Sequence, residues 1–199
     1  MAFTLTNTEI YDETRKFPVM MAWEKPYMEH CINMLPPVGD VLEVGFGLGI
    51  SATQVQKFPI RSHTIIECNP KVVKKARSWA NEQPHPVHII YAEWQNTLDI
   101  LGTFDTVFFD DCFLTAHPYE HNTACMRQFI EQIMKYHTRK TTRIGWYAEE
   151  PPSERIISLA KKWGAEYELY TYAIEKPTNL PYAQQYPNQM FVPQLTVHN

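Results

Sequence analysis

Short apolar runs alternate with amphipathic stretches along most of this chain. Runs of strand type occur at residues 41–44, 63–67, 87–91, 106–109, 142–147, 168–174 and 190–197. Helices are expected near residues 26–35, 51–56, 71–80, 124–136 and 153–163. Strands that alternate with helices predict an α/β fold with a doubly wound, mostly parallel sheet of seven strands. The last two runs have no helix between them, so we expect them to form a C-terminal antiparallel hairpin.

The ends of these segments carry local signals. Ser153 is expected to cap the last helix, and Gly164 follows that helix where a left-handed backbone is favoured. The first 17 or so residues are polar and show no period, which predicts a mobile arm or flap. A chain of 199 residues fits a single domain, and residues 1–28 form its expected N-terminal lid over the active site.

Composition narrows the kinds of partner. The formal net charge is -4 and there is no long basic run, so no nucleic-acid partner is expected. No stretch reaches the roughly 20 apolar residues of a membrane helix, and the first residues do not resemble a signal peptide. Four cysteines without a closely spaced pair favour a reducing compartment, the cytoplasm. His117 and His121 lack an obvious third ligand, so no metal is expected.

A glycine-rich turn follows the first strand of the predicted sheet. Residues 41–50 read Val-Leu-Glu-Val-Gly-Phe-Gly-Leu-Gly-Ile, and glycines let a backbone turn sharply against a ligand. Glu67 lies 20 residues after Gly47 at the end of the next strand, where a carboxylate accepts hydrogen bonds from the ribose of an adenosine cofactor. The alternatives are a plain strand-to-helix connection for the turn and a solvated strand end for Glu67.

The spacing of the turn favours one adenosine cofactor over another. A dinucleotide fingerprint needs a third glycine at position 50 beside a helix N-terminus that holds pyrophosphate, but Ile50 stands there. S-adenosylmethionine has no phosphate and does not need that site. Glu43 fits the same interpretation, as a carboxylate that organises the turn and the amino end of the cofactor. The antiparallel ending also favours the methyltransferase form of this Rossmann-like sheet.

Two carboxylates follow the fourth predicted strand. Asp110 and Asp111 come directly after the run at 106–109, and ligands gather at the carboxyl ends of strands in such sheets. Asp110 is expected near the reactive methyl group, where it would orient an acceptor nitrogen. For Asp111, capping of a turn is the alternative.

Several motifs together resemble the guanidinoacetate N-methyltransferase family. They are Phe17-Pro-Val-Met-Met-Ala-Trp-Glu-Lys-Pro-Tyr-Met28, Val41 to Gly47, Ile65-Ile-Glu-Cys-Asn69, Trp94, and Phe104-Asp105 leading to Asp110. The resemblance is close over about residues 11–114 and loose over 143–196, where Tyr186-Pro-Asn-Gln-Met190 and Pro193 carry it. It implies a class I S-adenosylmethionine-dependent methyltransferase that acts on a guanidino nitrogen.

The resemblance also implies which residues hold the cofactor. Those expected in contact with it, or in its turn, are Met20, Met28, Glu43, Gly45, Phe46, Gly47, Leu48, Gly49, Ile50, Ser51, Glu67, Cys68, Asn69, Trp94, Gln95 and Asp110. In this scheme Glu67, Cys68 and Asn69 bind the ribose and its neighbours. Trp94 and Gln95 flank the adenine.

Glu24 and Asp110 are the implied catalytic pair that grips the guanidino group. A guanidinium is planar and presents a fork of N–H donors that matches carboxylates. Two carboxylates bind it from different edges and draw off its positive charge. Asp110 is the expected proton acceptor and Glu24 the orienting group. From the residues alone, Glu24 is equally a surface residue at a helix start.

The chain departs from the family at the turn after the fifth strand. The family receives the substrate carboxylate there with a Leu-Thr pair, but Glu149 and Glu150 occupy the matching positions. They would repel a carboxylate unless they point to solvent while backbone N–H groups bind the anion. The acceptor would otherwise carry an amine or hydroxyl. We therefore expect a small guanidine acceptor and a monomer or homodimer. The alternatives are protein arginine, another amine, or cofactor binding without catalysis.

Overall fold

A computed structural model describes residues 3–14, 16–111, 118–180, 183–184 and 187–199 of the protein. Its strands are β1 Phe3–Leu5, β2 Glu9–Asp12, β3 Phe17–Met21, β4 Gly39–Val44, β5 Ile60–Glu67, β6 Val87–Tyr91, β7 Phe104–Phe109, β8 Thr138–Trp146, β9 Glu166–Ala173 and β10 Gln189–His198. Its α-helices are α1 Lys25–Met34, α2 Ile50–Val55, α3 Pro70–Ala80, α4 Pro118–Gln132 and α5 Glu154–Lys162. Short 3₁₀ turns lie at Ala22–Glu24, Trp94–Asn96 and Leu98–Ile100, and a π turn, Ile133–His137, follows α4.

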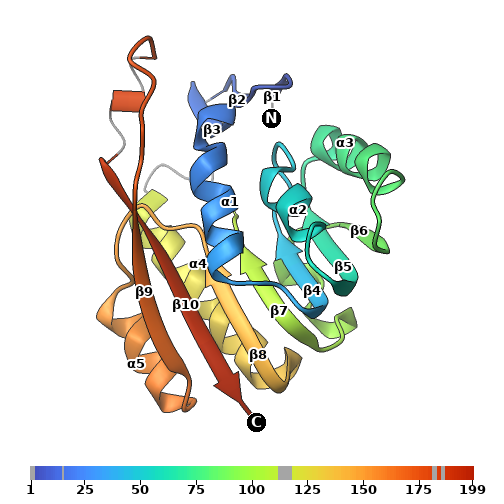
Figure 1. Ribbon diagram of the computed structural model, residues 1–199, viewed down its shortest axis with the longest axis vertical. Helices are drawn as coiled ribbons and strands as arrows, with labels where there is room; N and C mark the ends of the chain where they lie inside the picture. Colours follow the sequence, from blue (N-terminus) through green and yellow to red (C-terminus); the bar gives the residue numbers. More distant parts are fainter. Residues whose placement is uncertain (1–2, 15, 112–117, 181–182, 185–186) are drawn as a thin grey trace.

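Seven strands form one sheet in the order β6-β5-β4-β7-β8-β10-β9. The first five are parallel to their neighbours, whereas β10 runs antiparallel to both β8 and β9. Figure 1 shows β10 pointing toward the end of the molecule opposite to the carboxyl ends of the parallel strands. The predicted doubly wound sheet and its C-terminal antiparallel hairpin are confirmed.

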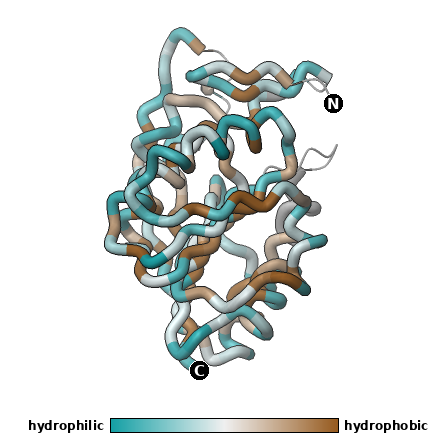
Figure 2. Tube along the Cα trace, turned by 90° about the vertical axis from the view of Figure 1, so that its right-hand side faces the viewer, coloured by the Kyte–Doolittle hydropathy of each residue, from teal (hydrophilic) through white to brown (hydrophobic). Residues whose placement is uncertain are grey.

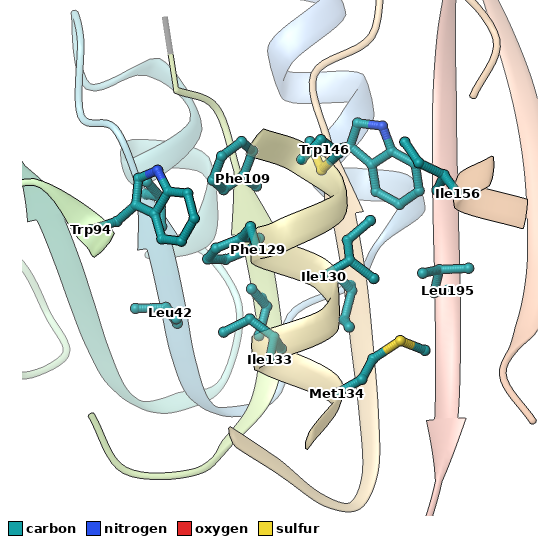
Figure 3. Packing of buried hydrophobic residues seen from close by; sticks show 14 of the residues in the cluster. Leu42, Trp94, Phe109, Phe129, Ile130, Ile133, Met134, Trp146, Ile156 and Leu195 are labelled. Carbon is teal, nitrogen blue, oxygen red and sulfur yellow. The ribbon is translucent and has the colours of Figure 1, made fainter. Parts of the chain in front are cut away.

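Helices cover both faces of this sheet, because each carries one apolar side. Tyr27, Cys31 and Ile32 of α1 pack with α2 and α3 on one face. On the other face, α4 inserts Phe129 and Ile130 between β4, β7 and α5, as Figure 3 shows. The hydropathy colouring of Figure 2 likewise places apolar segments inside the body of the molecule. In the part of the chain that the structure describes, no helix is long and apolar enough to cross a membrane.

The N-terminal segment differs from the prediction of a patternless arm. Strands β1, β2 and β3 form a separate antiparallel sheet with a register irregularity between Ile10 and Tyr11. Ile10 and Asp12 of β2 point inward and are buried, while their neighbours are partly exposed. This short period-2 pattern was hidden by the polar composition. Figures 1 and 2 show the small sheet at the end toward which the parallel strands point.

Local signals at α5 are only partly as predicted. Ser153 occupies the N-cap position with an extended backbone, but its side chain makes no capping hydrogen bond. The carbonyl of Ser153 instead accepts the N–H of Ile156 at 2.9 Å. Gly164 has a φ of 67°, which confirms the left-handed end of the helix.

Candidate active site

The carboxyl ends of four parallel strands meet at one edge of the sheet. Val44 of β4 pairs with Ile66 of β5 and Phe109 of β7, and Phe109 pairs with Trp146 of β8. The residues that come next along these strands therefore lie along the same edge, and they are Gly45, Glu67, Asp110 and Tyr147. The topology thus brings together the predicted cofactor turn and one predicted catalytic carboxylate.

The glycine turn needs its glycines for backbone reasons. Gly45, Gly47 and Gly49 have φ values of 85°, 53° and 82°, a region that disfavours residues with a side chain. A Cβ on Gly45 would lie 2.0 Å from the carbonyl oxygen of Asp110. The turn is therefore packed directly against the backbone of the catalytic candidate. The N–H of Asp110 also donates to the carbonyl of Val44 at 2.9 Å.

Glu67 is buried and orders the turn from the neighbouring strand. Its Oε2 accepts the N–H of Phe46 at 3.0 Å, and its Oε1 accepts the N–H of Asn69 at 2.7 Å. Each carboxylate oxygen keeps a second lone pair, so the expected contact with ribose hydroxyls stays a prediction. The structure adds a role that the spacing did not reveal, since Glu67 ties the glycine turn to the start of α3.

Glu43 lies behind the turn and has no exposed surface. Its carboxylate accepts a short hydrogen bond from the Ser51 hydroxyl at the start of α2. The Nε2 atom of His63 on β5 lies 2.8 Å from the other oxygen of Glu43. The arrangement agrees with a carboxylate that organises the turn, and it adds His63. The only sequence signal for His63 is a polar side chain within an apolar strand run.

One of the two methionines predicted to contact the cofactor, Met20, packs against the glycine turn. The Leu48 N–H donates to the sulfur of Met20 at 3.1 Å, and a Cβ on Gly47 would lie 2.3 Å from that sulfur. Met20 thus rests on the predicted cofactor turn. Met28 has no exposed surface and belongs to the core, so its contact with a cofactor would require its neighbours to move. The lid function of residues 1–28 stays a prediction.

The adenosine end of the predicted site has mixed exposure. Trp94 is buried edge-on against Phe109 and Phe129, as Figure 3 shows, and its indole N–H donates to Asp111 at 2.9 Å. This bond gives Asp111 a definite partner, while the turn that it would cap begins at residue 112, outside the described residues. Cys68 and Gln95 are exposed, and Leu48, Ile50 and Asn69 are half-buried. The contacts with the cofactor predicted for these residues stay predictions.

Asn69 has a structural role that the sequence did not separate from cofactor binding. Its side-chain oxygen accepts the N–H groups of Lys71 and Val72 at 2.9 and 3.4 Å. Asn69 is therefore the N-cap of α3, followed by Pro70 in the first turn.

Glu24 ends the 3₁₀ turn before α1, and its side chain is only 4% exposed. One of its oxygens accepts the N–H of Met21 at 3.0 Å. Burial raises the pKa of Glu24 to about 8, aided by the negative charges of Asp110 and Glu149, against hydrogen bonds from Met21 and Tyr147. The surface interpretation of Glu24 is therefore wrong. Glu24 is a buried carboxyl, and it lies close enough to Asp110 for the charge of Asp110 to raise its pKa.

Asp110 is a second desolvated carboxyl of the site. Burial raises its pKa to about 7, and the charges of Glu43, Asp111 and Glu67 add to the shift. For Asp111, burial raises the pKa to about 6 despite the hydrogen bond from Trp94. Among the described residues, no lysine or arginine contributes to the pKa shifts of Glu24, Asp110 or Asp111. The site therefore gathers carboxyl groups that no described lysine or arginine helps to ionise, which favours a cationic ligand whose charge would let them ionise.

Tyr27 fixes the position of Glu24 relative to the end of β8. Its buried hydroxyl accepts the N–H of Ala148 at 3.0 Å and donates to the carbonyl of Phe191 on β10 at 2.6 Å. Its ring meets Tyr147 edge-on, with centroids 5.4 Å apart. In the sequence Tyr27 is noted only as part of the family motif, and the role of Tyr147 was missed. The available signal was the place of Tyr147 directly after a strand, beside Asp110.

Glu149 and Glu150 are both exposed at the edge of this site. Glu149 accepts a hydrogen bond from the Tyr147 hydroxyl at 3.3 Å. Its pKa is raised, mainly by desolvation and then by the charge of Glu150. His117 and His121, the pair for which no metal is expected, fall partly outside the described residues because His117 is not described. Tyr186 of the family motif lies outside them as well.

Comparison with protein families points to one enzyme family. Residues 4–147 match the model of the guanidinoacetate N-methyltransferase family. Protein arginine N-methyltransferase 2 of Candida glabrata is 35% identical over 113 residues, which cover 54% of this chain and 27% of that protein. The protein of the same name in Saccharomyces cerevisiae is 34% identical over 101 residues, covering 48% of this chain and 24% of that protein. The chain aligns with about a quarter of the length of these curated relatives.

Solved structures share the fold. A precorrin-6y C5,15-methyltransferase from Geobacter metallireducens GS-15 superimposes with a TM-score of 0.60 at 14% identity, covering 85% of this chain and 87% of that chain. An O-methyltransferase from Bacillus cereus, in complex with SAH, has a TM-score of 0.59 at 13% identity, covering 90% of this chain and 82% of that chain. At such low identity the likeness concerns the fold, and it confirms the predicted methyltransferase form of the sheet.

Proposed function

Because this chain belongs to the guanidinoacetate N-methyltransferase family, a family of S-adenosylmethionine-dependent methyltransferases, we propose that it methylates a guanidino nitrogen of a small molecule. The observation that carries the proposal is the pair of desolvated carboxyls, Glu24 and Asp110. The charge of Asp110 raises the pKa of Glu24, and no lysine or arginine of the described residues contributes to the pKa shift of either carboxyl. A guanidinium supplies the missing positive charge together with N–H donors for both carboxylates. Cytoplasmic location and oligomeric state stay predictions.

The cofactor is S-adenosylmethionine, as the sequence predicts. The residues present fit it, because the turn has no side chain at Gly45, Gly47 and Gly49, and Glu67 presents a buried carboxylate beside it. When bound, S-adenosylmethionine supplies an electrophilic methyl group on its sulfonium. No phosphate-binding residue is needed for such a ligand.

In this proposal the two carboxylates divide the work of binding and deprotonation. Glu24 is fixed through Met21 and the α1 helix start, so it orients the guanidinium. Asp110 has a pKa near 7 before the cation binds, which suits a group that accepts a proton at neutral pH. As Asp110 takes the N–H proton, the acceptor nitrogen regains its lone pair. The binding geometry holds that nitrogen for in-line attack, which supplies much of the rate enhancement.

A second candidate is methylation of arginine in a protein. It is favoured by the identity of about a third with the two fungal proteins named protein arginine N-methyltransferase 2. An arginine side chain presents the same guanidinium to Glu24 and Asp110. The two candidates therefore share the chemistry and differ in what the guanidine is attached to.

The test is transfer of a labelled methyl group from S-adenosylmethionine to free guanidines and to arginine-containing peptides. We expect turnover of guanidines, and a loss of at least about 100-fold in kcat for Asp110→Asn because the proton acceptor is lost. Glu24→Gln should also lose activity while it keeps most of its cofactor affinity. The exposed residues Asp99 and Glu82 provide the control variants Asp99→Asn and Glu82→Gln, which should retain parent activity.

Two outcomes would contradict the proposal. Turnover of guanidines at the parent rate by both site variants would remove the carboxylate pair from the mechanism. Tight cofactor binding with no turnover of any guanidine or arginine peptide would instead favour a cofactor-binding protein without catalysis. A preference for peptides over every free guanidine would select the second candidate.

A further inference from the structure

The rim of the site carries an aromatic hydroxyl bonded to an exposed carboxylate. Tyr147 donates to Oε1 of Glu149 at 3.3 Å, and Glu150 follows next in the chain. The Tyr147 hydroxyl is also within hydrogen-bond reach of Glu24 and lowers the pKa of that carboxyl, and its single proton serves one of the two carboxylates at a time. Tyr147 therefore lies between the buried carboxylate of the guanidine site and the acidic rim.

Backbone contacts fix this rim beside the proposed guanidine site. The N–H of Tyr147 donates to the carbonyl of Phe109 at 3.1 Å, directly before Asp110. The N–H of Ala148 donates to the Tyr27 hydroxyl at 3.0 Å, and Tyr27 lies one helical turn after Glu24. The segment from Tyr147 to Glu149 is thus tied to the strand that precedes Asp110 and to the helix that follows Glu24.

The carboxylate of Glu149 interacts electrostatically with the guanidine site, and no described residue forms an ion pair with it. Of the described residues, none forms an ion pair with Glu149 or Glu150. The charge of Glu149 acts on Glu24, because it raises the pKa of that carboxyl. A carboxylate at the far end of a short guanidine would enter this negative field, whereas an amine, hydroxyl or amide would find acceptors for its hydrogens.

We propose that Tyr147 and Glu149 form a tail subsite that selects guanidines whose far end is positively charged or neutral and disfavours those that end in a carboxylate. The inference rests on the proposed guanidine methylation and specifies its acceptor class. Tyr147 acts as a positioning residue, because its hydroxyl holds the Glu149 carboxylate toward Glu24. The Glu149 carboxylate attracts a positively charged far end of the guanidine and repels a carboxylate there.

The test uses three free guanidines of equal chain length that end in an amine, a hydroxyl or a carboxylate. We expect kcat/KM to decrease in that order. In Glu149→Gln, the ratio of the amine to the carboxylate acceptor should fall about threefold to fivefold, as for an exposed charge pair. Tyr147→Phe keeps the ring against Tyr27 and should lower the same ratio, since the carboxylate is no longer held.

The chain provides a matched control on the edge strand β9. Tyr170 donates to Oε1 of Glu168 at 3.0 Å with the same two-residue separation. Tyr170→Phe and Glu168→Gln remove an equivalent exposed pair away from the site and should leave the ratio unchanged. If the Tyr147 or Glu149 variants do not fold, the parent enzyme still gives an answer, because 0.5 M salt should compress its amine-to-carboxylate ratio.

The outcomes separate this inference from the proposed function. Methylation of all three guanidines with equal kcat/KM, or a preference for the carboxylate, would overturn the tail subsite and leave guanidine methylation standing. A preference that neither Glu149→Gln, Tyr147→Phe nor salt reduces would also overturn it. Absence of turnover with every guanidine would overturn both.

Discussion

Glu24 and Asp110 are carboxyl groups held where their charged forms are poorly solvated. Their raised pKa values mean that the folded chain binds protons there which the unfolded chain releases. A structural ion pair would show the opposite shift, because a neighbouring cation lowers a carboxyl pKa. Groups shifted upward by burial and by like charges are characteristic of functional sites. At the residue scale, this is the strongest indication of a cationic ligand.

The stability of the protein should report this arrangement. The pKa of Glu24 is about 8 in the folded state against 4.5 for the ordinary group. The free energy of unfolding therefore falls as pH rises through this window, since the folded state binds the extra proton. Glutamine does not titrate, so Glu24→Gln removes the decrease in stability at high pH. Its amide oxygen can still accept the hydrogen bond from the Met21 N–H. We expect the variant to lie within about 1 kcal/mol of the parent at pH 5 and to exceed it by roughly 2–4 kcal/mol at pH 8, because each unit of pKa difference corresponds to about 1.4 kcal/mol.

Urea unfolding at pH 5, 6.5 and 8 measures this difference. The exposed variant Glu82→Gln is the control and should follow the parent at each pH. A Glu24→Gln variant that is less stable than the parent at pH 8 would show that the carboxylate is stabilised in the folded chain, contrary to its assigned environment.

At the element scale, the glycine turn and the end of β7 behave as one unit. Gly45 touches the carbonyl of Asp110, Phe46 is bonded to Glu67, and Asp110 is bonded to Val44. A cofactor turn and an acceptor-binding residue thus share a backbone contact. Displacing one should displace the other.

Gly45→Ala tests this coupling. The added methyl group would lie 2.0 Å from the Asp110 carbonyl oxygen, and the residue would keep a left-handed backbone that costs an alanine about 1–2 kcal/mol. We expect a loss of at least about 2 kcal/mol of stability in urea unfolding, and weaker binding of both S-adenosylmethionine and a guanidine in calorimetry. Gly102→Ala is the control, because nothing lies within 4 Å of the added Cβ. Equal stability of the two variants would refute the tight contact.

At the scale of the whole molecule, the main sheet was predictable from sequence. The central strands β4 and β7 are mostly buried apolar runs, so their pattern is strong, and the edge strand β6 was predicted at its observed bounds. The N-terminal sheet was missed because β1 and β2 span only three and four residues within a stretch in which most residues are polar. In strands of three or four residues, the alternation of apolar and polar positions is too short to distinguish a strand from a loop.

The site was predictable in type more than in detail. The cofactor turn and Asp110 follow strand ends, where the fold gathers ligands, so their convergence could be foreseen. Glu24 was identified through its family motif, because a single glutamate at a helix start carries no signal of burial. Tyr147 and His63 were missed, since their roles depend on neighbours from other elements, Tyr27 of α1 for Tyr147 and Glu43 of β4 for His63. Register between distant segments creates these contacts, and no local pattern records it.

The most direct test of the central claim is calorimetry of guanidine binding as a function of pH, with S-adenosylhomocysteine in the cofactor site and in buffers of different ionisation enthalpy. Glu24 and Asp110 have pKa values of about 8 and 7 in the free site, and a bound guanidinium lowers both. The account predicts that affinity rises from pH 6 to about pH 9, with protons released at pH 6.5 and almost none at pH 9.5. Affinity independent of pH, with no proton release at pH 6.5, would contradict it.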